Sequence, residues 1–116
     1  MDIEDIRTFC KTLPAVTEDV KWGNDLCFSV GAKMFCVIGM SMPLTMSFKV
    51  HDEAFEELSV SPHFKPAPYL ARYKWVYLDN SSAIPSKQLK EYIRQSYEMI
   101  KSKLPKKILK EIGLGS

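Results

Sequence analysis

The stretch from residue 66 to residue 79 decides how this chain is expected to fold, and it reads Pro66-Ala67-Pro68-Tyr69-Leu70-Ala71-Arg72-Tyr73-Lys74-Trp75-Val76-Tyr77-Leu78-Asp79. The two prolines restrict the residues before them to extended conformations. The aromatic and β-branched residues that follow favour a strand. Because side chains alternate along a strand, Tyr73, Trp75 and Tyr77 are predicted on one face and Val76 and Leu78 on the other. Three aromatic side chains on one face indicate either a thick core or a stacking surface.

Length and composition indicate one globular domain. The chain has 116 residues, of which 46% are hydrophobic and 26% are charged, and these values are typical of a soluble domain. We therefore expect a single domain over residues 1–116. No apolar run approaches the length of a membrane span, and the acidic start is unlike a signal peptide.

The three cysteines, Cys10, Cys27 and Cys36, include no C-x-x-C pair. An odd number without such pairs favours buried thiols in a reducing compartment over a disulfide framework. His51 and His63 lie outside any recognisable zinc-ligand spacing. We therefore expect a cytoplasmic protein of bacterial type that binds no metal or other cofactor, does not associate with membranes, and is a monomer.

The net charge of +2 is unevenly distributed along the chain. Among the first 20 residues, acidic side chains outnumber basic ones. Residues 87–116 contain eight basic and three acidic side chains. An acidic start and a basic end predict an electrostatically polarised molecule.

Residues 1–50 are expected to form a helix followed by three strands. Asp2 can cap the helix, with Asp5 in the capping-box position, and Pro14 ends it. Residues 15–25 are predicted to be a connection. The strands are expected over residues 26–30, 33–38 and 44–50, with a type II′ turn at Gly31-Ala32 between the first two.

The second half of the chain is expected to add one more strand and three helices. A short acidic helix opens at His51-Asp52, and residues 59–68 are predicted to be a loop. The stretch quoted above supplies the fourth strand. The long helix is predicted from Pro85 to Leu104, because apolar residues recur at helical spacing throughout it, and a short basic helix follows over residues 106–112. Short links between the strands favour hairpins, so the fold class is α+β: a two-layer sandwich, with helices on one face of an antiparallel sheet.

Six short pieces of the chain carry a resemblance to a known family. They are Gly31-Ala32-Lys33-Met34-Phe35, Ser47-Phe48-Lys49, Pro66-Ala67-Pro68-Tyr69, Lys74-Trp75-Val76, and Ser96-Tyr97-Glu98 followed by Lys103-Leu104-Pro105. In this order, and over nearly the whole chain, the sequence resembles the MmcQ/YjbR family of small bacterial proteins. The resemblance implies a CyaY-like (frataxin-like) fold. It also implies a DNA-binding role, which is assigned to family members because their structures are similar to a double-wing fold. The resemblance implies no catalytic motif.

The residues predicted to contact nucleic acid are Lys33, Lys49, Arg72, Lys74 and Trp75. Basic side chains beside an aromatic ring suit phosphate contact combined with base stacking. We therefore predict that they form one exposed patch of a non-enzymatic DNA-binding protein. The alternatives are a solvated edge with Trp75 packed in the core or lying on its rim, and a domain that binds a protein or small ligand through its aromatic sheet face.

Two other charged groups offer weaker hypotheses. A basic stripe could follow a nucleic-acid backbone, although such a stripe is more often the solvated side of an amphipathic helix; it contains Lys87, Lys90, Arg94 and Lys101 and continues at Lys103, Lys106, Lys107 and Lys110. Acidic residues near the start are similar to the ridge that binds iron in frataxin-like proteins, but helix N-termini attract acids in any case. No motif for catalysis is present, so we expect a protein that is not an enzyme.

Overall fold

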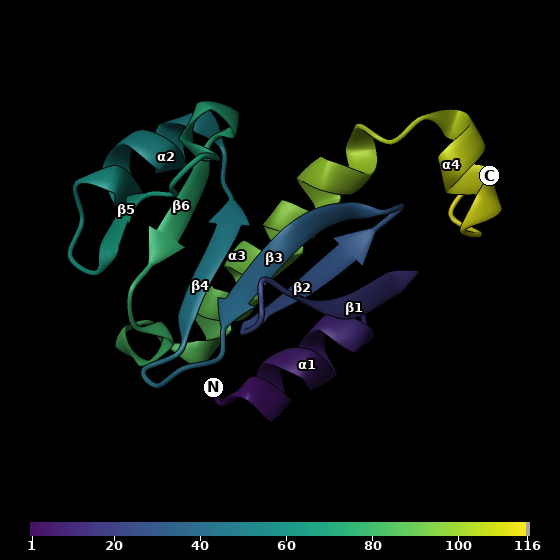
Figure 1. Cartoon of the computed structure of the whole chain (residues 1–116). Coiled ribbons are helices and arrows are strands. Elements are labelled where there is room, and N and C mark those ends of the chain that lie inside the picture. Colours follow the sequence, from purple (N-terminus) through teal and green to yellow (C-terminus); the bar gives the residue numbers. More distant parts are fainter. Residues whose placement is uncertain (116) are drawn as a thin grey trace.

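Six strands form one antiparallel sheet with the spatial order β1-β2-β3-β4-β6-β5 (Figure 1). The computed structural model describes residues 1–115. The strands are β1 (Val16–Lys21), β2 (Asp25–Val30), β3 (Lys33–Gly39), β4 (Thr45–Lys49), β5 (Phe64–Pro66) and β6 (Trp75–Leu78). β6 lies between β4 and β5, so the chain reaches the edge of the sheet first and then returns to pair with β4.

Helices cover the apolar side of the sheet, with α3 running behind the middle strands in Figure 1. The helices are α1 (Ile3–Lys11), α2 (Asp52–Ser59), α3 (Ser86–Ser102) and α4 (Lys106–Glu111), with single 3₁₀ turns η1 (Ala71–Tyr73) and η2 (Ser81–Ala83). The predicted α+β two-layer fold is confirmed. Within residues 1–115, no helix is both long enough and apolar enough to cross a membrane.

A row of core side chains crosses the sheet. Phe28, Cys36, Phe48 and Val76 are paired across β2, β3, β4 and β6, and all four are fully buried. On the helical side, α3 supplies Leu89, Ile93 and Tyr97, which are likewise fully buried. The apolar periodicity of the long helix therefore predicted the correct face.

The predicted start of the chain is also confirmed. Asp2 caps α1 by accepting a hydrogen bond from the Asp5 backbone at 2.8 Å, and the Asp5 side chain accepts one from the Asp2 backbone at 3.2 Å. This reciprocal pair satisfies two backbone donors that a helix otherwise leaves free at its N-terminus.

Two strands were missed because both lie at edges of the sheet. β1 lies inside the stretch 15–25 that was predicted to be a connection, and only two of its six residues are apolar. β5 lies inside the predicted loop 59–68 and is three residues long. An edge strand needs only one partner and one buried face, and it tolerates the missing N–H of Pro66. Neither edge strand therefore shows a clear hydrophobic alternation.

Two local predictions were wrong for reasons of backbone conformation. Gly31 and Ala32 both have positive φ, 58° and 64°, which is the pattern of a type I′ turn rather than the predicted type II′ turn. Tyr73 ends the turn η1, and Lys74 is left-handed with φ 66°. The last strand therefore begins at Trp75, and Tyr73 does not share a strand face with it.

The C-terminal segment packs on the turn between β2 and β3. A side chain at Gly31 would place its Cβ 2.7 Å from Cδ1 of Leu104 and 2.9 Å from Cγ2 of Ile108. Glycine therefore serves here both for its left-handed backbone and for the close approach of α4.

Candidate functional site: a lysine-lined groove in the sheet

The sheet divides between its two central strands. β3 and β4 are paired from Gly39 with Thr45 to Cys36 with Phe48, and beyond this pair the strands diverge toward their Lys33 and Lys49 ends (Figure 1). The sheet therefore consists of two three-stranded halves that are joined at only one end of the β3–β4 pair.

A buried hydroxyl group from α3 occupies the point of divergence. Ser96 donates a hydrogen bond to the carbonyl of Phe35 at 2.6 Å and accepts one from the backbone N–H of Lys49 at 3.0 Å. Its side chain is fully buried. Phe35 and Lys49 are the next residues after the last β3–β4 pair, so the hydroxyl satisfies the two backbone groups that the ladder leaves open.

A groove with a volume of about 450 Å³ lies beside this point. The residues that line it come from β3, β4, the start of β6 with the loop before it, and the end of α3, and we call the apolar side chains of Met34, Ile100 and Leu104 its floor. It is lined by Lys33, Met34, Lys49, Leu70, Tyr73, Trp75, Ile100, Lys103, Leu104 and Pro105. The groove therefore has an apolar interior with three ammonium groups around it.

The side chains that line the groove carry only positive charge. Lys33, Lys49 and Lys103 line it together with no carboxylate, and none of the three forms an ion pair with any residue between positions 1 and 115. Burial lowers the pKa of Lys49, and the positive charges of Lys103 and Lys74 act in the same direction against the opposing effect of Asp52. A bound anion would therefore relieve a repulsion that the free protein contains.

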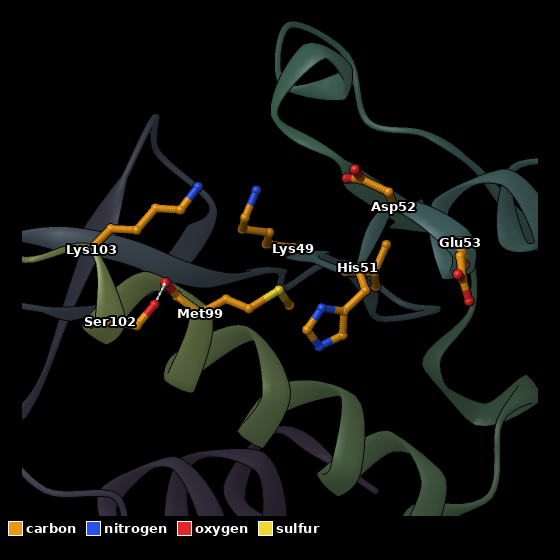
Figure 2. A pocket seen from close by; sticks show the side chains of 8 residues that line it. Lys49, His51, Asp52, Glu53, Met99, Ser102 and Lys103 are labelled. Atoms are coloured by element: carbon orange, nitrogen blue, oxygen red, sulfur yellow. Dashed lines mark hydrogen bonds between the residues drawn. The ribbon is translucent and has the colours of Figure 1, made fainter.

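A second cavity of about 570 Å³ adjoins the groove and shares Lys49 and Lys103 with it. Figure 2 shows the two ammonium groups on one side of this cavity and the carboxylates of Asp52 and Glu53 on the other, with the His51 ring below. Because charges of both signs line this cavity, it is a poorer site for an anion than the groove.

The predicted contact residues fall into two groups. Lys33, Lys49 and Trp75 line the groove, although they are far apart in the sequence. Arg72 and Lys74 lie beside the groove without lining it. The Arg72 guanidinium is 5.3 Å from the centre of the Tyr73 ring, and the Lys74 Nζ is 5.0 Å from the centre of the Phe55 ring.

The prediction that Trp75 is exposed was wrong. Its side chain is only 5% exposed, because the loop from Ala67 to Tyr73 folds back over the start of β6, where the Trp75 N–H donates to the carbonyl of Leu70. Trp75 therefore forms part of a wall of the groove and is not an open stacking platform. The more accessible aromatic side chain is Tyr73, which is 55% exposed.

Sequence reasoning missed Tyr73 and Lys103 as members of the site. Tyr73 was placed on a strand face, and Lys103 was counted with the basic stripe of α3. Their position depends on the η1 turn and on the end of α3 reaching the divergent strands. Two local signals were present, an aromatic residue between Arg72 and Lys74 and a lysine directly before Leu104-Pro105.

Several of the other charged groups are engaged within the protein. Arg94 and Lys101 of the basic stripe pair with Glu91 and Glu98. Near the start, Arg7 pairs with both Glu4 and Glu18, so these two acidic residues have partners within the fold. Across residues 1–115, no three side chains of the metal-binding types are grouped to hold an ion.

Comparison with known proteins places this fold in a class of small α+β domains that carry an open antiparallel sheet. The chain belongs to the YjbR family, whose model matches residues 11–99. This confirms the resemblance found in the sequence.

Two crystal structures are similar to the chain. A Deinococcus radiodurans protein with a DUF419 domain is 30% identical, with a TM-score of 0.84 over 97% of this chain and 88% of that one. A Pseudomonas syringae protein is 14% identical, with a TM-score of 0.68 over 85% of this chain and 98% of that one, and this likeness shows the fold alone. The comparison with curated proteins gave no match.

Proposed function

We propose that this protein is a non-enzymatic DNA-binding protein that holds the sugar-phosphate backbone at the rim of the groove. The observation that carries the proposal is the combination of three lysines and no carboxylate in the groove lining. Phosphate contacts with lysine and arginine supply most of the affinity of sequence-independent DNA binding. Arg72, whose guanidinium lies over the Tyr73 ring, and Lys74, whose ammonium lies over the Phe55 ring, add positive charge beside the groove.

The absence of an enzymatic role is part of the proposal. The groove lining includes no histidine, carboxylate or cysteine, so its lysines and Tyr73 have there none of the partners that most often activate such groups in enzymes. Burial raises the pKa of Cys10 to about 12 and raises the pKa of Cys36 well above its ordinary value. These thiols are therefore poor nucleophiles.

Binding of labelled DNA at two salt concentrations tests the proposal, with fluorescence anisotropy as the readout. The double variant Lys49→Glu/Lys103→Glu is expected to abolish binding at low salt. Arg72→Glu/Lys74→Glu is also expected to abolish it, with little change in melting temperature. Neutralising one phosphate-binding lysine or arginine at a time should lower the salt slope by about one unit for each side chain.

The matched control is Lys87→Glu/Lys90→Glu, which changes the net charge by the same amount on a part of α3 that does not line the groove. This control should keep its DNA binding. If the wild-type protein bound no DNA at low salt, the proposal would be wrong. If the control lost DNA binding to the same extent as the groove variant, the basic stripe of α3 would be the contact surface instead.

The apolar floor of the groove favours one other candidate function. Ile100, Leu104 and Met34 offer a surface for a small amphiphilic anion, and a concave apolar site with a few polar groups is typical of ligand pockets. Binding of such a ligand would depend only weakly on salt, whereas DNA binding falls steeply with it. The same titrations with a small aromatic carboxylate in place of DNA separate the two functions.

A further inference from the structure

We infer that the groove selects single-stranded nucleic acid and takes up one unstacked base between the divergent ends of β3 and β4. This inference rests on the proposed DNA-binding function and specifies the form of nucleic acid that is bound. The shape of the groove, its apolar floor, and the positions of its aromatic and basic side chains support it.

The apolar floor is the first argument. Contact with the phosphates of a duplex needs only basic and polar groups at a surface, and it would leave Met34, Ile100 and Leu104 without a partner. Within a duplex, a base pair presents only its edges in the grooves, whereas an unstacked base presents a flat apolar face. A groove of about 450 Å³ is large enough for one base with its sugar, but a duplex cannot enter it.

The aromatic side chains are the second argument. Tyr73 is 55% exposed and lines the groove, and the Arg72 guanidinium lies over its ring at 5.3 Å. Trp75 lines the same groove and is almost completely buried. The accessible phenol ring of Tyr73 suits the stacking of a single base, which is the usual device of proteins that bind single strands, and the buried indole forms a rigid apolar wall beside it.

The position of the lysines is the third argument. The Lys49 ammonium donates one hydrogen bond to the carbonyl of Tyr73, which leaves two of its three protons for a ligand. Lys103 lines both the groove and the adjoining cavity, as Lys49 does. Lys33 lies on β3, across the groove from the β4 residue Lys49. Cations on several sides of an apolar slot complement a nucleotide whose base is inside and whose phosphates are outside.

Trp75 provides a direct readout of base insertion. The other tryptophan, Trp22, is 70% exposed in the turn between β1 and β2, and it does not line the groove. In a Trp22→Phe background, the emission of Trp75 therefore reports the groove alone. The titrations use an oligothymidine single strand, the same strand with abasic sites at every position, and a duplex of equal length.

We expect the single strand to bind with a saturable change in Trp75 emission. The abasic strand should bind about 5- to 100-fold more weakly, as expected when one stacked base is absent, and should leave the emission unchanged. Tyr73→Ala should weaken binding of the normal strand by a similar factor without weakening the abasic strand, whereas Tyr73→Phe should bind like the parent protein. A thermal melt of each variant checks that it is folded.

Three results would overturn the inference, and they can be told apart. If the duplex bound as tightly as the single strand through Lys49 and Lys103, the proposed function would stand and base insertion would be wrong. Equal binding of the abasic and normal strands would have the same meaning. If none of the three nucleic acids bound at low salt, the proposed function itself would fail.

Discussion

The Ser96 hydroxyl donates a 2.6 Å hydrogen bond to the carbonyl of Phe35, at the point where the sheet divides. The same oxygen accepts the N–H of Lys49 at 3.0 Å. A helix side chain therefore replaces the backbone pairing that would otherwise join β3 and β4 here. Beyond this point the two strands diverge, and the groove lies beside it.

Removal of this hydroxyl should destabilise the fold. Ser96→Ala leaves a buried carbonyl and a buried N–H without partners, and we expect the free energy of unfolding to fall by about 1–3 kcal/mol. Urea denaturation measures this decrease. The matched control is Ser102→Ala, because Ser102 is exposed and bonds only the nearby Met99 carbonyl. Equal stability of both variants would mean that Phe35 and Lys49 pair with each other once the hydroxyl is gone.

The middle of α3 should contribute strongly to the core. Ile93 is fully buried against the sheet, so Ile93→Ala should cost about 2–5 kcal/mol, as for other buried large-to-small changes. Ile100→Ala should cost less than Ile93→Ala, since Ile100 is only partly buried and lines the groove. Thermal melts test this order, and two unchanged melting temperatures would show that this helix face is not part of the core.

The ion pair between α1 and β1 should make stability depend on pH. Hydrogen bonds from Arg7 lower the pKa of Glu18 to about 2, with a smaller effect of Lys11. A lowered carboxyl pKa stabilises the fold at pH values above the ordinary value of about 4.3, and this stabilisation is lost as the pH falls toward about 2.

Glu18→Gln should therefore be less stable than the wild type at pH 7, and the difference should disappear by about pH 2. The difference should be small and should shrink in high salt, because the pair lies near the surface. Glu56→Gln is the control, since Glu56 is exposed and forms no ion pair within residues 1–115. A constant difference between pH 7 and about pH 2 would contradict this assignment.

The cysteines should be unreactive in the folded protein. Cys10, Cys27 and Cys36 are free and buried, and burial raises the pKa of all three. A thiol reagent such as DTNB should modify none of them at pH 8 without denaturant and all three in guanidinium. Fast modification of the native protein, a disulfide in its native mass, or stoichiometric zinc would show that the cysteines have another role.

The interior of the fold could be predicted from the sequence because its patterns are strong and local. The alternation from Leu44 to Val50 and the helical spacing around Ile93 each predicted the buried face correctly. The edge strands β1 and β5 could not be predicted from their own residues. β1 is largely polar, and β5 has only three residues. Tertiary pairing outweighs β-propensity at such edges.

The candidate site was predicted in part. Lys33, Lys49 and Trp75 do line one groove, but the exposure of Trp75 was wrong because a left-handed Lys74 turns the preceding loop back across it. Lys103 and Tyr73 belong to the groove through the divergence of β3 and β4. At that divergence Ser96 bonds the Phe35 carbonyl and the Lys49 N–H, and a serine within an amphipathic helix gives no sequence signal for this role.

The packing of the C-terminal segment on the β2–β3 turn has an evolutionary consequence. Position 31 must accept a left-handed backbone, which asparagine also tolerates, but any side chain there would collide with Leu104 and Ile108. Substitutions at these three positions should therefore be epistatic. A homologue with asparagine at position 31 is expected to have smaller residues at positions 104 and 108, and an alignment of the family can reveal this co-variation.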